Sequence, residues 1–331
     1  RVVNLGLSSD VADVSFAISL VRTAKISGRV TNTDGTAAAG GTVTLVTDAP
    51  VRSGGPAARN YNGSVTYDGQ FTVENVAPGR YTLRARGGGG GRNAARNPPT
   101  FASMPLTVTG DDQGNIAITL AAAAGMAGSA TFQNTQTASP PNINGFRVSV
   151  PPSDFDGSGN GQTQIDARTG TFNIDGLAPG EHLLQTQSPR GWALKSATVN
   201  GRDIADVPFD MPSGQKLTNV TLVFTDQTTE LDGTVADQRG APVTEYTVLA
   251  FPENQDFWRV QSRHIMTARP DQNGKYQLHG LPAGAYYLAI IDPAQQGEWF
   301  EPSFLQQQLA GARHVALNDG QTQTQDFTVQ R

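Results

Sequence analysis

The local motif with the most specific spacing of oxygen-bearing side chains is the segment DFDGSGNGQ, near the middle of the chain. Oxygen atoms recur there at every second position, on Asp154, Asp156, Ser158 and Asn160. This spacing, with a glycine at the sixth position, can wrap a hard cation, which favours a calcium site. The twelfth position carries Ile165 in place of the bidentate glutamate that a tight site needs. We therefore expect either a weak calcium loop or an ordinary polar hairpin loop.

Other chemistry-bearing residues do not form a recognised catalytic motif. The four histidines, His182, His264, His279 and His314, do not occur in an HExxH spacing, and no Gly-x-Ser-x-Gly is present. The glycine run 87–91 lacks the Lys-Ser/Thr pair and the following helix of a phosphate-binding loop, so it favours a surface loop. We predict a protein that is not an enzyme and that has no cofactor beyond the calcium considered above.

Three aromatic residues near the end of the chain are candidates for contact with a ligand. Trp258, Trp299 and Phe300 lie close in sequence to an insertion at 293–313, where Pro302 can occupy the first turn of a short helix. If exposed, these rings would form a platform for a polysaccharide or a peptide. If buried, they would cap the end of a β-domain under the helix.

Composition excludes several classes of partner. The 331 residues have a net charge of −5 and only 16% of them are charged, with no basic block, which argues against nucleic acid. The lack of cysteine excludes disulfides and cysteine-ligated metal sites. No apolar run approaches the roughly 20 residues of a transmembrane helix. Because the chain begins with Arg1, we expect a processed product or a fragment of a longer protein.

A repeat of about 100 residues organises the chain. A short strand pattern with a central glycine occurs around Gly28, Gly128 and Gly233, which lie 100 and 105 residues apart. A turn with two flanking strands and then a closing alternating strand follow in each repeat. The predicted units, called here the first, middle and last units, are residues 25–121, 122–226 and 227–331.

Within each unit, apolar and polar residues alternate, which is typical of strands with one buried face. Tight hairpins are indicated where Asp68, Thr169 and Asn273 each precede a glycine between alternating runs. About seven short strands in each unit predict an all-β protein of tandem antiparallel β-sandwiches, with a short helix in the last.

A Pro-Gly or Pro-Ala-Gly element follows each predicted hairpin and resembles a tyrosine corner. Tyr81 and Tyr286 would hold the turn into the next strand in the first and last units. His182 stands at this place in the middle unit. We interpret His182 as a corner residue rather than a ligand.

These patterns together resemble the carboxypeptidase regulatory-like domain. The opening SGRVTNTDG, the hairpin DGQFTVENVAPGRYTL and the closing strand carry the resemblance, which covers all three units. It is weakest where the middle unit begins, since Ala130 replaces the usual valine and no Asp-Gly turn follows. The domain is a transthyretin-like, Ig-like β-sandwich found in tandem in bacterial exported proteins. The resemblance implies a non-enzymatic role and an extracellular, cell-surface or periplasmic location, and it names no ligand.

Residues 1–24 fit none of the units and look like the closing strand of another domain. Their apolar row, formed by Val14, Phe16, Ile18 and Leu20, would promote aggregation if it were left in water. Some sheet must therefore cover it. The partner is either an upstream domain of the same chain or another copy of the protein that accepts the strand at a sheet edge.

Two functions from different classes are consistent with the sequence. The first is a structural or adhesive extracellular protein, a filament of rigid sandwiches assembled head to tail by strand addition. The second is an accessory array that binds carbohydrate or peptide within a larger secreted enzyme or receptor. Short connections between the units favour the first, and an exposed aromatic row would favour the second.

Overall fold

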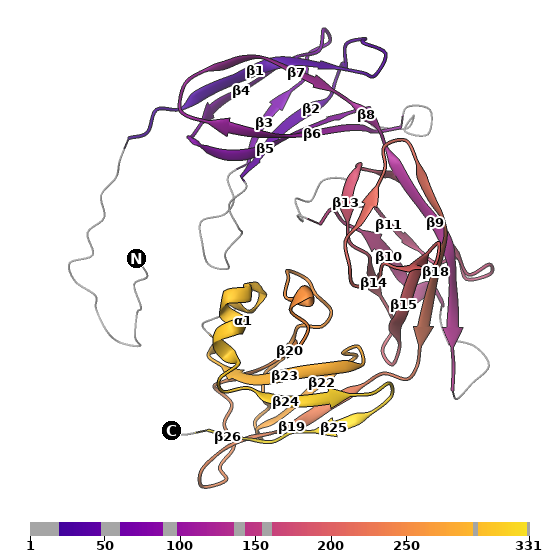
Figure 1. Ribbon diagram of the computed structural model, residues 1–331, viewed down its shortest axis with the longest axis vertical. Helices are drawn as coiled ribbons and strands as arrows, with labels where there is room; N and C mark the ends of the chain where they lie inside the picture. The colour runs from indigo at the N-terminus through magenta and orange to yellow at the C-terminus, as the bar shows by residue number, and fades with distance from the viewer. Residues whose placement is uncertain are drawn as a thin grey trace.

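A computed structural model describes residues 20–47, 60–88, 98–135, 143–153, 161–293 and 297–329. These residues form 26 β-strands and one short α-helix near the end of the chain, so the prediction of an all-β protein with a short helix in the last unit is confirmed. The strands gather in three groups that follow one another along an arc (Figure 1).

The strands of the first unit form two sheets. One sheet has the order β4-β1-β7 and the other the order β3-β2-β5-β6-β8. Their bounds are Ala24–Thr31 for β1, Thr42–Thr47 for β2, Tyr61–Ser64 for β3, Gln70–Val76 for β4, Gly79–Gly87 for β5, Thr100–Val108 for β6, Gln113–Thr119 for β7 and Ala121–Ala122 for β8. Burial alternates along β1 and β5, as the sequence pattern predicts for strands with one face in the core.

The strands of the middle unit form a five-stranded sheet, β12-β9-β18-β15-β16, with a three-stranded sheet, β11-β10-β14, and the pair β13-β17. Their bounds are Ala124–Gln133 for β9, Arg147–Val150 for β10, Gly161–Gln164 for β11, Thr171–Leu177 for β12, Gly180–His182 for β13, Gln185–Gln187 for β14, Ala193–Val199 for β15, Arg202–Asp203 for β16, Phe209–Met211 for β17 and Lys216–Thr225 for β18. A single 3-10 turn, Ile143–Gly145, precedes β10.

The strands of the last unit form the sheet β22-β19-β25, in which β26 also pairs with β19, and the sheet β21-β20-β23-β24. Their bounds are Glu230–Asp237 for β19, Thr247–Pro252 for β20, Met266–Ala268 for β21, Lys275–His279 for β22, Gly284–Ile291 for β23, Arg313–Leu317 for β24, Thr322–Thr324 for β25 and Phe327–Val329 for β26. Helix α1 spans Pro302–Gln308, and two 3-10 turns span Gln255–Phe257 and Glu298–Phe300.

The opening and closing strands of each unit lie side by side and run parallel, whereas the other pairings are antiparallel. The repeated glycine is explained by this pairing. A Cβ built on Gly128 would lie 2.0 Å from the carbonyl oxygen of Val220 in the closing strand β18. A Cβ on Gly28 would lie 2.0 Å from the carbonyl oxygen of Ile116 in β7, and one on Gly233 would lie 2.0 Å from that of Gln325, between β25 and β26. Each repeat therefore requires a residue without a side chain at this position.

The predicted hairpins and corners are present. The glycines after Asp68, Thr169 and Asn273 have left-handed φ values of 84°, 68° and 73°, as a tight turn requires. The hydroxyl of Tyr81 donates to the carbonyl of Ala77 four residues earlier, at 2.9 Å. Tyr286 makes the same bond to Pro282 at 2.8 Å. These bonds hold the turn that leads into β5 and β23.

The last unit buries both faces of its second sheet. One face contributes to the core between the two sheets, and the other lies under α1 and the segment before it. All six residues of β20 are consequently buried. Phe304 and Leu305 are the residues of α1 that pack onto this second core. The helix thus covers a sheet face instead of extending the sandwich.

Candidate functional site

Several residues proposed from the sequence lie outside the described part of the chain. These are the calcium candidates Asp154, Asp156, Ser158 and Asn160 and the strand residues Val14, Phe16 and Ile18. The fourth member of the apolar row, Leu20, is described and its side chain is fully exposed. The calcium loop and the strand row stay predictions.

The aromatic candidates of the last unit pack against its second core. Trp258 is 5% exposed, and its indole N–H donates to the carbonyl of Pro252 at 2.7 Å. Trp299 and Phe300 are partly buried against the same core, with their ring centroids 6.1 Å apart. Of the two arrangements considered from the sequence, this placement fits the cap under the helix.

The middle and last units are joined by a group of charged side chains that we call the polar clasp. It consists of the ion pair of Asp206 and Arg263 and the adjacent imidazole of His264. Arg263 donates from Nε to Asp206 Oδ1 at 2.6 Å and from Nη2 to Asp206 Oδ2 at 2.7 Å, which is a bidentate pair. Its remaining nitrogen, Nη1, donates to the carbonyl of Leu194. One guanidinium of the last unit thus binds the loop between β16 and β17 and the start of β15 in the middle unit.

Each side of the polar clasp is placed by buried neighbours in its own unit. Asp206 directly follows Ile204 and Ala205, which lie in the core of the middle unit. On the other side, Trp258 and Ile265 anchor the two ends of the loop that carries Arg263. Because both loops are fixed by apolar contacts, the ion pair joins two preformed surfaces.

The carboxylate of Asp206 is held in its charged form by these contacts. Burial alone would raise its pKa, but the hydrogen bonds and positive charge of Arg263 outweigh burial and the pKa lies well below its ordinary value. His264 Nε2 lies 3.2 Å from Asp206 Oδ1. Its Nδ1 lies 2.9 Å from the hydroxyl of the corner residue Tyr286. The clasp is therefore connected to the corner of the last unit.

Two further contacts cross the same junction. Gln185 Nε2 donates to Gln261 Oε1, and Gln261 has a left-handed φ of 58°. Lys195 pairs with Asp319 at 3.3 Å. This exposed pair adds little free energy by itself. Because this pair joins the same two units at another point, the junction extends beyond the polar clasp.

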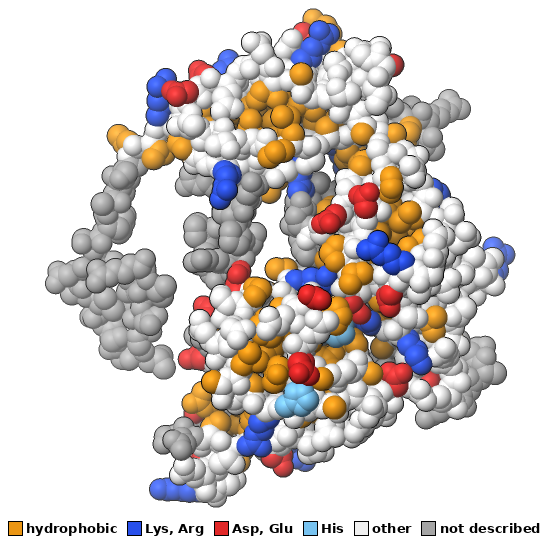
Figure 2. Space-filling view, in the orientation of Figure 1, with side chains coloured by type: hydrophobic (Ala, Val, Ile, Leu, Met, Phe, Trp, Pro, Cys, Tyr) orange, Lys and Arg blue, Asp and Glu red, His pale blue; other side chains and the backbone are white. Residues whose placement is uncertain are grey.

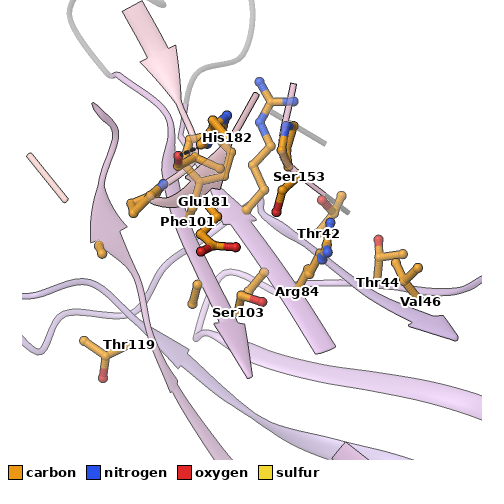
Figure 3. Close-up of a pocket in the computed structure, with 18 of the residues that line it drawn as sticks. Thr42, Thr44, Val46, Arg84, Phe101, Ser103, Thr119, Ser153, Glu181 and His182 are labelled. Atoms are coloured by element: carbon orange, nitrogen blue, oxygen red, sulfur yellow. Dashed lines mark hydrogen bonds between the residues drawn. The ribbon is translucent and has the colours of Figure 1, made fainter. Parts of the chain in front are cut away.

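The first and middle units enclose a cleft of about 860 Å³. One wall is the outward face of the sheet containing β2, β5 and β6, whose side chains include Arg84, Arg86 and Phe101. The opposite wall is the middle unit at Pro152–Ser153 and Ala178–His182. Figure 3 shows the labelled threonine and serine side chains of the cleft together with Arg84, Glu181 and His182.

His182 takes the place of the corner tyrosine, as expected, and lies beside this cleft. It is 1% exposed, with Nε2 2.7 Å from the carbonyl oxygen of Ala178 and Nδ1 3.0 Å from that of Val150. Both partners are acceptors, and a ring nitrogen donates to its carbonyl only where it carries the hydrogen. The imidazole thus lies between the carbonyl of Ala178, which closes the turn, and the carbonyl of Val150 in β10.

The described residues contain no group of three or more His, Cys, Asp or Glu side chains arranged to hold a metal ion. Among them no helix is both long and apolar enough to cross a membrane. On the face shown in Figure 2, Lys and Arg side chains lie among Asp and Glu side chains.

Comparison with known proteins identifies the last unit. Residues 230–330 match the carboxypeptidase regulatory-like domain, and this part of the chain is such a domain. A search of curated proteins gives no significant match.

Solved structures with which the chain aligns include bacterial pilins. The Bacillus anthracis TIE protein is 11% identical over 93% of this chain, with a TM-score of 0.24, and this chain spans about half of it, 51%. The minor pilin GBS52 of Streptococcus agalactiae is 12% identical, with a TM-score of 0.31, over 61% of this chain and 96% of the pilin. BcpA, the major pilin subunit of Bacillus cereus, is 11% identical, with a TM-score of 0.23, over 93% of this chain and 98% of the pilin. TM-scores this low carry no functional argument.

Proposed function

We propose that this chain is a non-catalytic structural segment of an extracellular, cell-surface or periplasmic protein, in which tandem β-sandwich units are held in a fixed arrangement. The polar clasp is the observation that carries the proposal. Its guanidinium is bound at three nitrogens by groups of the neighbouring unit, and such fork geometry opposes rotation more strongly than a single contact does. A chain of independently moving binding modules would not need it.

The first junction supports the same role. Strand β8 ends at Ala122 in the sheet of the first unit, and β9 of the middle unit begins at Ala124. The carbonyl of Ala122 accepts hydrogen bonds from Ser213 Oγ at 3.2 Å and from the backbone N–H of Gly214 at 3.1 Å. The connecting segment is therefore bonded to the middle unit and has little freedom to act as a hinge.

We also propose that copies of the chain assemble by strand addition at the sheet edge of the first unit. In the middle unit, the closing strand β18 has β9 on one side and the additional antiparallel strand β15 on the other. The closing strand β7 of the first unit pairs only with β1 among the named strands. The middle unit thus supplies a precedent for a strand beside β7, and residues 13–20 of another copy are the strand that we propose for it.

The location outside the cytoplasm rests on the resemblance of the repeats to exported domains. The cleft between the first two units favours the second candidate function, a binding array, and its ligand is considered in the next subsection. The two functions are compatible, because a rigid array can also present a binding site.

Small-angle X-ray scattering of the purified chain tests the fixed arrangement. We expect one set of interunit positions, the arc of Figure 1, to reproduce the profile. A profile that requires an ensemble of unrelated interunit positions would contradict the proposal.

Electron microscopy tests the assembly part separately. We expect filaments from the intact chain and none from a chain lacking residues 1–23, which should keep the scattering profile of three folded units. Filaments from the truncated chain would refute strand addition and would leave the fixed arrangement untouched.

A further inference from the structure

We propose that the cleft between the first and middle units binds a short acidic oligosaccharide, of the uronic acid class. The cleft is about 860 Å³, toward the upper end of the roughly 300–1,000 Å³ that is usual for ligand sites. This assignment does not depend on the structural role proposed above, since it follows from the residues that line the cleft.

The charge of the lining favours an anion. Arg84 and Arg86 extend from β5 on the outward face of the sheet, two residues apart, and Glu181 is the acidic residue among the described lining residues. Arg86 lies over the ring of Phe101, with its guanidinium carbon 5.8 Å from the ring centroid. This contact positions the guanidinium beside the cleft. A carboxylate is the planar anion that guanidinium groups bind in bidentate fashion.

The remaining polar groups favour a polyhydroxylated ligand. Thr42 and Thr44 from β2 and Ser103 from β6 line the same wall as the arginines, and Thr119 is nearby. In the pairing of these strands, Thr42 lies opposite Arg86 and Ser103 opposite Arg84. Each arginine therefore has a hydroxyl beside it on the same face. Hydroxyls both donate and accept hydrogen bonds, as sugar hydroxyls do.

A peptide fits this wall less well. Strands β2 and β5 are interior strands of their sheet, whereas β6 pairs with β8 only at Thr100 and Phe101. The arginines and threonines of this wall stand on a sheet face whose backbone groups are used in the ladder, so an extended peptide could add a strand only along β6 beyond Phe101, beside the wall. Recognition on the wall itself comes from side chains, and those present are suited to carboxylate and hydroxyl groups.

Three variants test whether binding depends on the charged residues that line the cleft. Arg86→Met removes a guanidinium from the cleft. Arg80→Met is the matched control, because Arg80 is an exposed arginine on the same face of the same strand but outside the cleft. Glu181→Gln removes the negative charge of the lining at an exposed side chain.

Isothermal titration of the full chain with tetragalacturonate, the neutral galactotetraose and tetraglutamate tests the assignment. We expect tetragalacturonate to bind, and to bind at least about tenfold more weakly to Arg86→Met, which corresponds to about 1.4 kcal/mol. Arg80→Met should bind like the parent chain. Glu181→Gln should bind more tightly, and added salt should weaken binding.

Several results would overturn the inference: no binding of tetragalacturonate at millimolar concentration, equal binding of galactotetraose, or equal losses in Arg86→Met and Arg80→Met. If tetraglutamate bound as tightly as tetragalacturonate, the inferred ligand would be an acidic peptide and not an acidic sugar. Thermal melting checks that each variant is folded. If Arg86→Met does not fold, the test rests on Glu181→Gln. An unchanged affinity of that variant for tetragalacturonate would then refute the proposed site.

Discussion

Replacing Arg263 by methionine should loosen the junction between the middle and last units without unfolding either one. Methionine keeps an unbranched apolar stem but donates no hydrogen bond, so the variant loses all three bonds of the guanidinium to the middle unit. It also leaves the carboxylate of Asp206 without its bidentate partner, with His264 and Arg259 as its remaining neighbours. The loss is confined to the interface, since the cores of the two units do not include Arg263.

The size of the effect follows from burial. The side chains of Arg263 and Asp206 are 29% and 18% exposed. Exposed ion pairs contribute about 0.2–1 kcal/mol, and breaking a fully buried pair costs about 3–5 kcal/mol. A pair with intermediate burial and bidentate geometry should lie between these limits, at about 2 kcal/mol. That free energy changes the ratio of open to closed junctions by roughly 30-fold.

Distances between spin labels measure the junction directly. The chain has no cysteine, so Arg168→Cys in the middle unit and Asn273→Cys in the last unit give two unique labelling sites on exposed hairpins. We expect a narrow distance distribution in the parent chain and a broad one in Arg263→Met. Arg239→Met, at an exposed hairpin of the last unit, is the control and should keep the narrow distribution.

The pH dependence has a definite sign. Because the pKa of Asp206 is lowered in the folded protein, its contribution is fully present above the ordinary carboxyl pKa of about 3.9 and is lost as the pH falls toward the lowered value. The narrow distribution should therefore persist at pH 5 and broaden only in stronger acid. A distribution that is equally narrow in the parent chain and in Arg263→Met would refute the reasoning, and so would broadening of the parent chain near pH 6.

Three other changes test separate features. His182→Phe should lower the free energy of unfolding by about 1–3 kcal/mol, because the buried hydrogen bond of the ring to a backbone carbonyl is lost, and His182→Tyr should recover part of this in urea unfolding; equal stabilities of the two variants would contradict the corner role. Gly128→Ala should destabilise the middle unit by more than about 3 kcal/mol or prevent its folding, because the added Cβ meets the carbonyl of Val220. Gly114→Ala, whose Cβ meets its nearest neighbour at 3.7 Å, should melt like the parent chain. If the loop around Asp156 binds calcium, millimolar calcium should raise the melting temperature and Asp156→Ala should abolish the rise; an unchanged melting curve would leave a polar loop.

The sequence by itself determined the elements and their repetition. Alternation of apolar residues marks strands because successive side chains point to opposite faces, so one buried face shows directly in the order of residues. The hairpins before Gly69 and Gly274 and the corner at Tyr81 are equally local, since each is closed within a few residues. The short helix was predictable from Pro302 and the apolar residues after it.

Other features were visible in the sequence, but their physical cause became clear only from the structure. Repetition marked Gly128 as special, but the reason lies about 90 residues away in the carbonyl of Val220. Trp258 was a candidate for either a ligand platform or a cap, because its residue type suits both. Its burial against the second core favours the cap, and this burial depends on where α1 lies over the sheet.

The junctions were decided by tertiary structure alone. Asp206 and Arg263 are single charged residues in unrelated loops, 57 positions apart, with no spacing that links them. The cleft likewise brings Arg86 of one unit opposite Glu181 of the next. Periodicity reports only which face of a strand is buried within its own unit. How two finished units meet depends on the complementarity of their surfaces, to which residues distant in sequence contribute, and no local pattern records it.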